Sequence, residues 1–240
     1  MTLLLLAGSG QARVIAKALS NRNIIASLAG ATRAPRDLGV PTRIGGFGGA
    51  AGFEAFLEAE KISAVLDATH PFANRISLRT ARICGARNIP YCQYLRPEWK
   101  PQDGDIWHLV QDETQVADLV TSGDTIFMAT GRQTLHRYEN LKDCHLICRQ
   151  IDETDAPFPF PNGRFLIGRP PFSVKDEIAL FRRLKIDWLV VKNAGGDAPR
   201  SKLEAARSLG IPVVMINRPE QPNALRVDTV EAAIEWAKNQ

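Results

Sequence analysis

The sequence has no apolar run that approaches the roughly 20 residues a membrane-spanning helix needs. The apolar run near the amino end, residues 3–6, lacks a basic leader and is too short for a secretory signal, so we interpret it as part of a β-strand. Because no export segment is recognisable, we expect a cytoplasmic protein.

Cysteine is scarce, with four residues in 240 and no CxxC pair, which is typical of reduced, partly buried thiols. His145 lies close to Cys144 and Cys148, but the three fall on a predicted strand without the spacing of a tetrahedral site. The sequence therefore predicts no metal.

Basic residues form no single cluster, and no nucleic-acid-binding motif is present, so we expect neither a nucleic acid nor a membrane as partner. The net charge of +4 and the pI near 9.0 nevertheless favour anionic partners. Arginines scattered through loops suit small anions with phosphate or carboxylate groups, although many would simply be solvated.

Short apolar runs that predict strands alternate along the chain with amphipathic runs that predict helices. The predicted strands are 2–7, 24–28, 64–68, 91–95, 125–129, 145–149, 188–191 and 213–216. The predicted helices are 12–21, 52–60, 74–87, 113–121, 174–184, 201–209 and 229–238. Such alternation is typical of an α/β fold with parallel sheets flanked by helices.

One segment, RPEWKP at residues 96–101, breaks this alternation. It predicts a hinge between two halves, 1–96 and 97–240, each of which could be a small α/β sandwich, with a ligand crevice between them. A single continuous sheet is the alternative.

The first predicted strand runs directly into a glycine-containing loop, Gly8-Ser9-Gly10-Gln11. Glycines there let the backbone approach a pyrophosphate, which then lies at the amino end of the following helix. The third glycine of the dinucleotide fingerprint is absent, but the loop has the strand-then-helix context that the motif requires. A tight turn without a ligand is the alternative.

The loop after the second strand contains Thr32, Arg33 and Arg36 where an NAD(H) site would place an acidic residue. Arginines suit a 2′-phosphate through charge-assisted hydrogen bonds, so we expect NADP(H) and assign residues 1–96 as its domain. An exposed basic loop without a ligand is the alternative.

Four glycines in five residues follow in RIGGFGG, residues 43–49. We interpret the bare backbone at Gly45 and Gly46 as a close approach to a ligand, with Arg43 available for an anion. Phe47 favours a packed, specific loop over a flexible linker.

An acid, a hydroxyl, an imidazole and an aromatic ring leave a predicted strand together in DATHPFA, residues 67–73. In an open α/β sheet this edge is where ligands bind. Pro71 disfavours helical geometry at His70, so we expect His70 to be extended and presented. The alternative is that Asp67 caps the next helix and His70 packs locally.

Three loops in the second half carry cations, amides or glycines at predicted strand ends, a combination that suits carboxylates or phosphates. They contain Thr130, Gly131, Arg132, Arg169, Lys192 and Asn193. Together they predict that residues 97–240 contribute the site of an anionic substrate.

With these motifs combined, the chain resembles the precorrin-6A reductase family of cobalamin biosynthesis, which includes the cobalt-precorrin-6A reductases. DATHPFA is the most specific element of the resemblance, which spans nearly the full length. It implies two Rossmann-like domains with the substrate in the cleft between them. It also implies an oxidoreductase in which NADPH delivers hydride to one double bond of a tetrapyrrole macrocycle, giving precorrin-6B. The substrate's many carboxylates would give the basic loops a purpose, and neighbouring enzymes of that pathway are candidate partners.

The resemblance also implies roles residue by residue. The NADPH diphosphate would be held by Gly8, Ser9, Gly10 and Gln11, and its 2′-phosphate by Arg33 and Arg36. The cofactor would further be lined by Arg43, Gly45, Gly46 and Phe47, with Thr69, His70, Pro71 and Phe72 near the nicotinamide. The substrate would face Thr130, Gly131, Arg132, Lys192 and Asn193. Arg169 is assigned to the substrate as well, although its loop, GRPPF, departs from the expected arginine-glycine-proline-phenylalanine order.

Reduction of a conjugated double bond needs a hydride at one carbon and a proton at its neighbour. The proton could come from His70, from a buried, protonated Asp67, or from water.

Three other functions are alternatives to this reduction: an NADP-dependent reductase of a smaller anion, a catalytically silent NADP(H) sensor, and an S-adenosylmethionine methyltransferase. The last is weakest, because the loop after the second strand lacks the acid that would hold its ribose.

Overall fold

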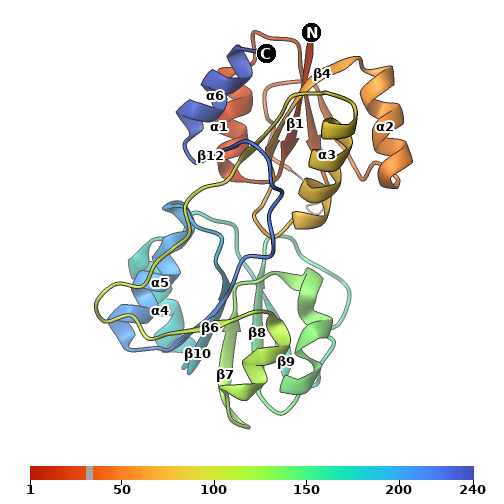
Figure 1. The fold of residues 1–240 in the computed structure, drawn as a ribbon. Helices are drawn as coiled ribbons and strands as arrows, with labels where there is room; N and C mark the ends of the chain where they lie inside the picture. Colours follow the sequence, from red (N-terminus) through yellow and green to blue (C-terminus); the bar gives the residue numbers. More distant parts are fainter. Residues whose placement is uncertain (31–34) are drawn as a thin grey trace. The chain divides into compact units, whose positions relative to one another are not determined.

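The computed structural model describes residues 1–30 and 35–240, which form two compact units. Unit 1 consists of Met1–Pro97 together with Pro219–Gln240, and unit 2 of Glu98–Arg218. Each unit contains one six-stranded, entirely parallel sheet with helices against it (Figure 1). The expected α/β fold with two Rossmann-like domains is confirmed.

Unit 1 has the strand order β12-β5-β4-β1-β2-β3. Its strands are β1 (Thr2–Ala7), β2 (Ile24–Leu28), β3 (Thr42–Ile44), β4 (Ile62–Ala68), β5 (Tyr91–Tyr94) and β12 (Arg226–Val227). Its helices are α1 (Gly10–Ala18), α2 (Gly49–Ala59), α3 (Asn74–Ala86) and α6 (Val230–Lys238).

Strand β1 explains the continuous leucine run, because both faces of the sheet are covered. Leu3 and Leu5 belong to the core formed with α1 and α6, whereas Leu4 and Leu6 belong to the core formed with α2 and α3. A parallel strand that is buried on both faces needs apolar residues at every position rather than at alternate ones.

Unit 2 has the strand order β6-β11-β10-β7-β8-β9. Its strands are β6 (Trp107–Val110), β7 (Thr125–Met128), β8 (His145–Gln150), β9 (Gly163–Ile167), β10 (Trp188–Lys192) and β11 (Val213–Ile216). Its α-helices are α4 (Val174–Leu184) and α5 (Ser201–Leu209), and its 3₁₀ helices are η1 (Glu113–Asp118), η2 (Arg132–Leu141) and η3 (Ala198–Arg200).

Each sheet has a topological switch point, where successive strands are added on opposite sides. In unit 1 the switch lies between β1 and β4, and in unit 2 it lies between β7 and β10. Loops that leave the carboxyl ends of those strands meet at the crevice where open α/β sheets bind ligands. The fold therefore places the DATHPFA loop beside the first glycine loop, and the loop at 130–132 beside the loop at 192–196.

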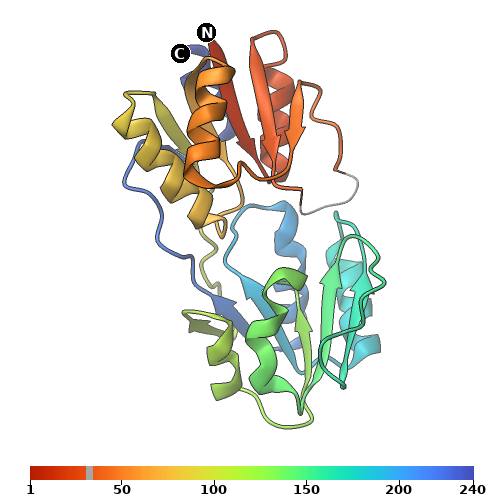
Figure 2. The same ribbon diagram turned by 90° about the vertical axis from the view of Figure 1, so that its right-hand side faces the viewer.

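The predicted domain boundary needs correction at the carboxyl end. We assigned all of 97–240 to the second domain, but Pro219–Gln240 belongs to unit 1. There β12 pairs with β5, and Ala233 and Ala237 of α6 are buried in the core that contains α1. Both chain ends consequently lie side by side in unit 1 (Figure 2).

Other differences from prediction are local. Strands β3, β6, β9 and β12 and the 3₁₀ helix η2 were not predicted, and the helix expected at 113–121 is the shorter 3₁₀ helix η1. Among the residues that the structure describes, no helix combines the length and apolar character required to cross a membrane.

Candidate functional site

The first glycine loop of unit 1 is fastened to the end of β4 by Ser9. The Ser9 hydroxyl accepts a hydrogen bond from the Ala12 amide at 3.2 Å, which caps α1, and donates to the Ala68 carbonyl at 3.1 Å. A Cβ atom on Gly8 would lie 3.4 Å from the His70 amide nitrogen, so the two loops approach closely. The structure thus brings together the two motifs on which the sequence interpretation depends.

Asp67 anchors the DATHPFA loop from inside the sheet. Its side chain is fully buried, and one carboxylate oxygen accepts from the Thr69 amide at 3.0 Å and from the Thr69 hydroxyl at 2.7 Å. The other oxygen accepts from the Tyr91 hydroxyl at 2.8 Å. Burial and then the charge of Asp67 raise the pKa of Tyr91, so this hydroxyl stays protonated as a donor. Asp67 therefore faces the protein interior rather than a ligand.

His70 is half-buried, and one of its ring nitrogens accepts a hydrogen bond within the DATHPFA loop. Its Nδ1 atom lies 3.3 Å from the Phe72 amide, which donates to it. When the imidazole is neutral, an accepting Nδ1 places the ring proton on Nε2. The Pro71 carbonyl accepts from Gln221 at 2.9 Å, so the returning carboxyl-terminal segment also holds this loop.

Arg43 organises the second glycine loop instead of projecting from it. Its guanidinium donates to the Gly45 carbonyl at 2.8 Å and to the Gly46 carbonyl at 2.9 Å, and it stacks 4.0 Å from the Phe47 ring centre. Burial lowers the pKa of Arg43. Phe47 is only 8% exposed and packs on Phe53 in the core, so its ring does not line an open site. What the loop leaves accessible is the backbone at Gly45 and Gly46.

Of the two arginines predicted to hold the 2′-phosphate, one lies among the described residues. Arg36 is exposed in the loop that leads toward β3. Arg33 lies outside the described residues, as does Thr32. The assignment of this loop to a 2′-phosphate stays a prediction.

A buried cation that we did not single out from the sequence lies against the first glycine loop. Arg96, just beyond β5, is 8% exposed, and its Nη1 atom donates to Gln11 Oε1 at 2.8 Å. In the sequence it is one of many loop arginines beside a proline, and nothing local connects it with residue 11.

In unit 2 the loop after β7 starts the 3₁₀ helix η2. The Tyr138 hydroxyl donates to Thr130 Oγ1 at 3.2 Å, and Gly131 has a φ of 75°, a left-handed conformation that favours glycine. Arg132 follows as the exposed first residue of η2. These residues present a hydroxyl, a backbone turn and a cation at the switch point.

Lys192 ends β10 within a network of charges. Its Nζ atom lies 3.1 Å from Glu113 Oε1 and 3.2 Å from Thr134 Oγ1, and Glu113 also accepts from Arg137 at 2.8 Å. Burial alone would raise the pKa of Glu113, but the hydrogen bond from Arg137 and the charge of Lys192 outweigh it and lower that pKa. Lys192 is therefore a cation that already has a carboxylate partner.

Asn193 does not have the position expected of a substrate-binding residue. It is 5% exposed, and its amide accepts from the Trp99 amide nitrogen at 2.9 Å and donates to the Trp99 carbonyl at 3.1 Å. Both ends of the side chain are consumed in fastening the segment that begins unit 2. The sequence could not reveal this, because an asparagine after a strand is equally typical of a binding loop.

Arg169 is partly exposed and forms an ion pair with Asp152 at 3.1 Å. Its loop is held by Phe172, whose ring centre lies 4.3 Å from the guanidinium of Arg149. Arg149 in turn forms a two-pronged ion pair with Glu177, with distances of 2.7 and 2.5 Å. This buried pair was not recognised from the sequence.

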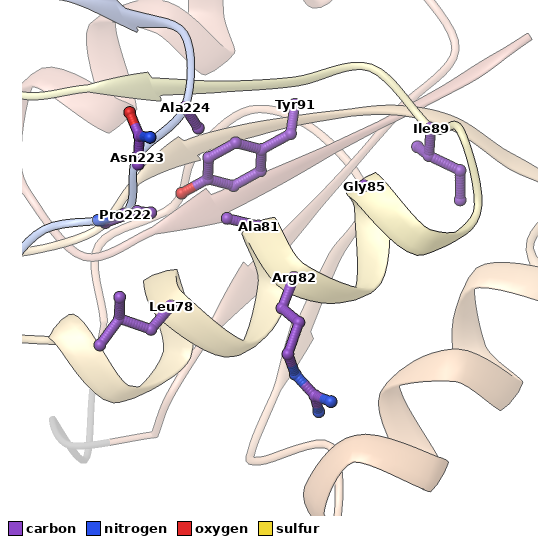
Figure 3. Close-up of a pocket in the computed structure, with 9 residues that line it drawn as sticks. All are labelled: Leu78, Ala81, Arg82, Gly85, Ile89, Tyr91, Pro222, Asn223 and Ala224. Carbon is purple, nitrogen blue, oxygen red and sulfur yellow. The ribbon is translucent and has the colours of Figure 1, made fainter.

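A cavity of about 440 Å³ lies behind Tyr91, between α3 and the segment 222–224 (Figure 3). Its lining is mainly apolar and contains none of the predicted site residues: Leu78, Ala81, Arg82, Gly85, Ile89, Tyr91, Pro222, Asn223 and Ala224. Tyr91 connects it with the DATHPFA loop through the hydrogen bond to Asp67.

Comparison with known proteins adds a further finding. The family model described as "Precorrin-6x reductase CbiJ/CobK" matches residues 2–238. A precorrin-6A reductase of Rhodococcus erythropolis is 43% identical over 239 residues, which cover 98% of this chain and 96% of that protein. The solved structure of a CobK precorrin-6A reductase matches with a TM-score of 0.94 and 37% identity, covering 100% of this chain and 96% of the other. A cobalt-precorrin-6A reductase of Priestia megaterium is more distant, 25% identical over 77% of this chain and 76% of its own.

Proposed function

The chain belongs to the precorrin-6x reductase family, CbiJ/CobK, and we propose that it reduces precorrin-6A to precorrin-6B with NADPH in cobalamin biosynthesis. The observation that carries the proposal is the family match over almost the entire chain, in sequence and in fold alike. We favour the metal-free macrocycle over its cobalt form, because the relatives named for the former are more similar to this chain.

The first glycine loop fits the diphosphate of NADPH. Gly8 and Gly10 are exposed, and a Cβ atom on Gly10 would meet nothing within 4 Å, so the backbone borders open space at the start of α1. A helix amino terminus with exposed N–H groups favours phosphate. Ser9 and Gln11 complete this loop, and Arg33 and Arg36 would hold the 2′-phosphate. When bound, NADPH supplies the hydride for one carbon of the macrocycle.

The DATHPFA loop would position the nicotinamide and provide a proton. His70 can donate from Nε2 because its Nδ1 atom accepts from the Phe72 amide. Asp67 would act from behind, by holding Thr69, and not as the acid. Most of the rate would come from holding the two reactants in near-attack geometry, and water is the other source of the proton.

The loops of unit 2 would bind the acetate and propionate carboxylates of the substrate. Arg132 is the exposed cation at the switch point, with Thr130 and the Gly131 backbone beside it. Lys192 and Arg169 would exchange a carboxylate of the protein for one of the substrate. Asn193 would contribute indirectly, by fixing the backbone from which Lys192 projects.

A spectroscopic assay tests the function. Purified protein is mixed with precorrin-6A, and the visible spectrum of the macrocycle is followed with NADPH and, in parallel, with NADH. We expect a shift of the chromophore with NADPH and little change with NADH. NADPH binding with an unchanged chromophore would contradict the proposed reaction.

Two other proposals remain distinct from this one. A catalytically silent NADP(H) sensor would bind the cofactor without turnover and would leave the cations of unit 2 without a role. A reductase of a smaller anion would reduce its own substrate but leave precorrin-6A unchanged. We also propose a cytoplasmic location, with neighbouring enzymes of the pathway as candidate partners.

A further inference from the structure

Arg96 puts a buried positive charge against the first turn of α1. Its side chain follows β5, and the residue is 8% exposed. Its contact is with Gln11, the second residue of the helix, at 2.8 Å. The amino end of a helix is already electropositive and repels a cation. The Arg96 guanidinium and the amino end of α1 therefore both attract an anion to the first turn of the helix.

The contact also fixes which way the Gln11 amide points. A guanidinium has donors only, so the atom that faces Arg96 must be the Gln11 carbonyl oxygen. The Nε2 group, with its two N–H donors, then points away from Arg96. Within residues 1–30 and 35–240, no hydrogen bond uses that Nε2 group.

Gln11 lies in the loop that would hold the NADPH diphosphate, directly after the exposed Gly10 and two residues beyond Ser9, the N-cap of α1. Without Arg96 this hydrogen bond would no longer hold the Gln11 carbonyl oxygen, which could then turn toward a phosphate. With Arg96 the amide is preset as a donor. Preorganised donors bind an anion more tightly because less ordering remains to be done.

We propose that Arg96 is a positioning residue of the cofactor site: it orients Gln11 as a diphosphate donor and adds its own positive charge to that end of α1. This inference rests on the proposed use of NADPH. It predicts a loss of affinity that depends on the diphosphate part of the cofactor and is not shared by ligands that lack it.

The test is equilibrium binding to the full-length protein, measured for NADPH by nicotinamide fluorescence and for adenosine 2′-monophosphate by calorimetry. The second ligand has the 2′-phosphate but no diphosphate. We expect Arg96→Met to weaken the binding of NADPH about tenfold or more, which is the size of one charge-assisted hydrogen bond. The affinity for adenosine 2′-monophosphate should stay unchanged. Arg96→Lys, which keeps a charged donor, should recover part of the loss.

A second pair of variants tests the route through Gln11. Gln11→Ala should also weaken NADPH binding. In the double variant Arg96→Met/Gln11→Ala, the loss of NADPH affinity should be smaller than the product of the two single losses. Gln11→Glu keeps a partner for Arg96 but presents a negative charge to the diphosphate. It should weaken NADPH while leaving the melting temperature intact, which tests the proposal even if Arg96→Met folds poorly.

Arg22→Met is the matched control, because Arg22 lies beyond the other end of α1 and donates to the Lys238 and Gln240 carbonyls. It should leave both affinities unchanged. The inference would be overturned if Arg96→Met lost affinity for both ligands equally. It would also be overturned if Arg96→Met and Gln11→Glu both kept the wild-type affinity for NADPH. If the wild-type protein binds no NADPH, the proposed function itself fails; if it binds and turns over NADPH normally, only the role of Arg96 is at issue.

Discussion

The switch points of the two units differ in what their strands present. In unit 1 the loops offer mainly backbone, and the side chains that matter most, Ser9 and Asp67, hold those loops from behind. In unit 2 the loops offer cations, and Lys192 and Arg169 are already bonded to carboxylates of the protein. Bare backbone suits a single ligand of fixed shape, whereas cations with exchangeable partners suit a ligand that carries many carboxylates.

The largest expected effect comes from the support of the unit 2 loops. Arg149→Met leaves Glu177, which is 1% exposed, without its partner, so we expect the free energy of unfolding to fall by about 3–5 kcal/mol. Urea denaturation measures this. The double variant Arg149→Met/Glu177→Leu, which removes both charges, should recover much of the loss. If Arg149→Met kept the wild-type free energy of unfolding, the Arg149–Glu177 pair would not stabilise the fold.

Asp67→Ala should break the corresponding support in unit 1. It leaves the Tyr91 hydroxyl and the Thr69 hydroxyl without their acceptor, at an expected cost of about 2–3 kcal/mol in the free energy of unfolding, together with weaker NADPH binding. The exposed Asp37, which accepts from the Gly39 amide, provides the control Asp37→Ala with little effect. Unchanged stability and NADPH affinity in Asp67→Ala would show that Asp67 does not support the DATHPFA loop.

Arg132→Ala sharpens the contrast between cofactor and substrate regions. We expect KM for precorrin-6A to rise about tenfold, because one exposed cation no longer meets a carboxylate, with kcat nearly unchanged. The dissociation constant of NADPH should stay as in the wild type. Steady-state kinetics and cofactor titration give both quantities, and an unchanged KM would exclude Arg132 from the substrate site.

His70→Ala should lose less activity than Arg132→Ala loses substrate affinity. Water can replace the imidazole as proton source, so kcat should fall by less than about tenfold, with NADPH and substrate still bound. Rates measured at saturating concentrations of both reactants test this. Total loss of turnover with intact binding would contradict it and make His70 the indispensable acid.

The last expected effect is a response of unit 1 to alkaline pH. Burial first, with the charge of Asp67 second, raises the pKa of Cys84 to about 12 and of Cys92 to about 11. Because the folded state then keeps protons that the unfolded state loses above its ordinary thiol pKa near 9.0, stability should fall as pH rises from 9 to 11. Cys84→Ala/Cys92→Ala should flatten that slope; an equally steep slope would assign it to other groups.

Most of the sheet could be predicted from the sequence, because buried parallel strands appear as continuous apolar runs bounded by glycine and proline. Strands β1, β2 and β11 begin and end where predicted. The missed strands β3 and β12 have three and two residues, too few to show a pattern. Helix α6 was predicted, but not its return to unit 1, because a local pattern does not specify the sheet on which a helix packs.

The candidate site shows a similar limit. The approach of the first glycine loop to DATHPFA could be predicted, because both follow strands whose carboxyl ends share one edge of a sheet. The direction of individual side chains could not. Arg43 and Asn193 have the residue types expected of ligand contacts, yet each binds backbone of its own unit. Arg96 became visible only through its contact with Gln11.

The proposed reaction is a direct transfer of hydride from NADPH to the macrocycle, and isotope labelling can follow that hydride. NADPH that carries deuterium at the transferable position of its nicotinamide is mixed with precorrin-6A and the protein, and the macrocycle is analysed by mass spectrometry. We expect the product to contain deuterium from the cofactor and a proton from solvent. A macrocycle of unchanged mass, with the deuterium still on the nicotinamide, would contradict it.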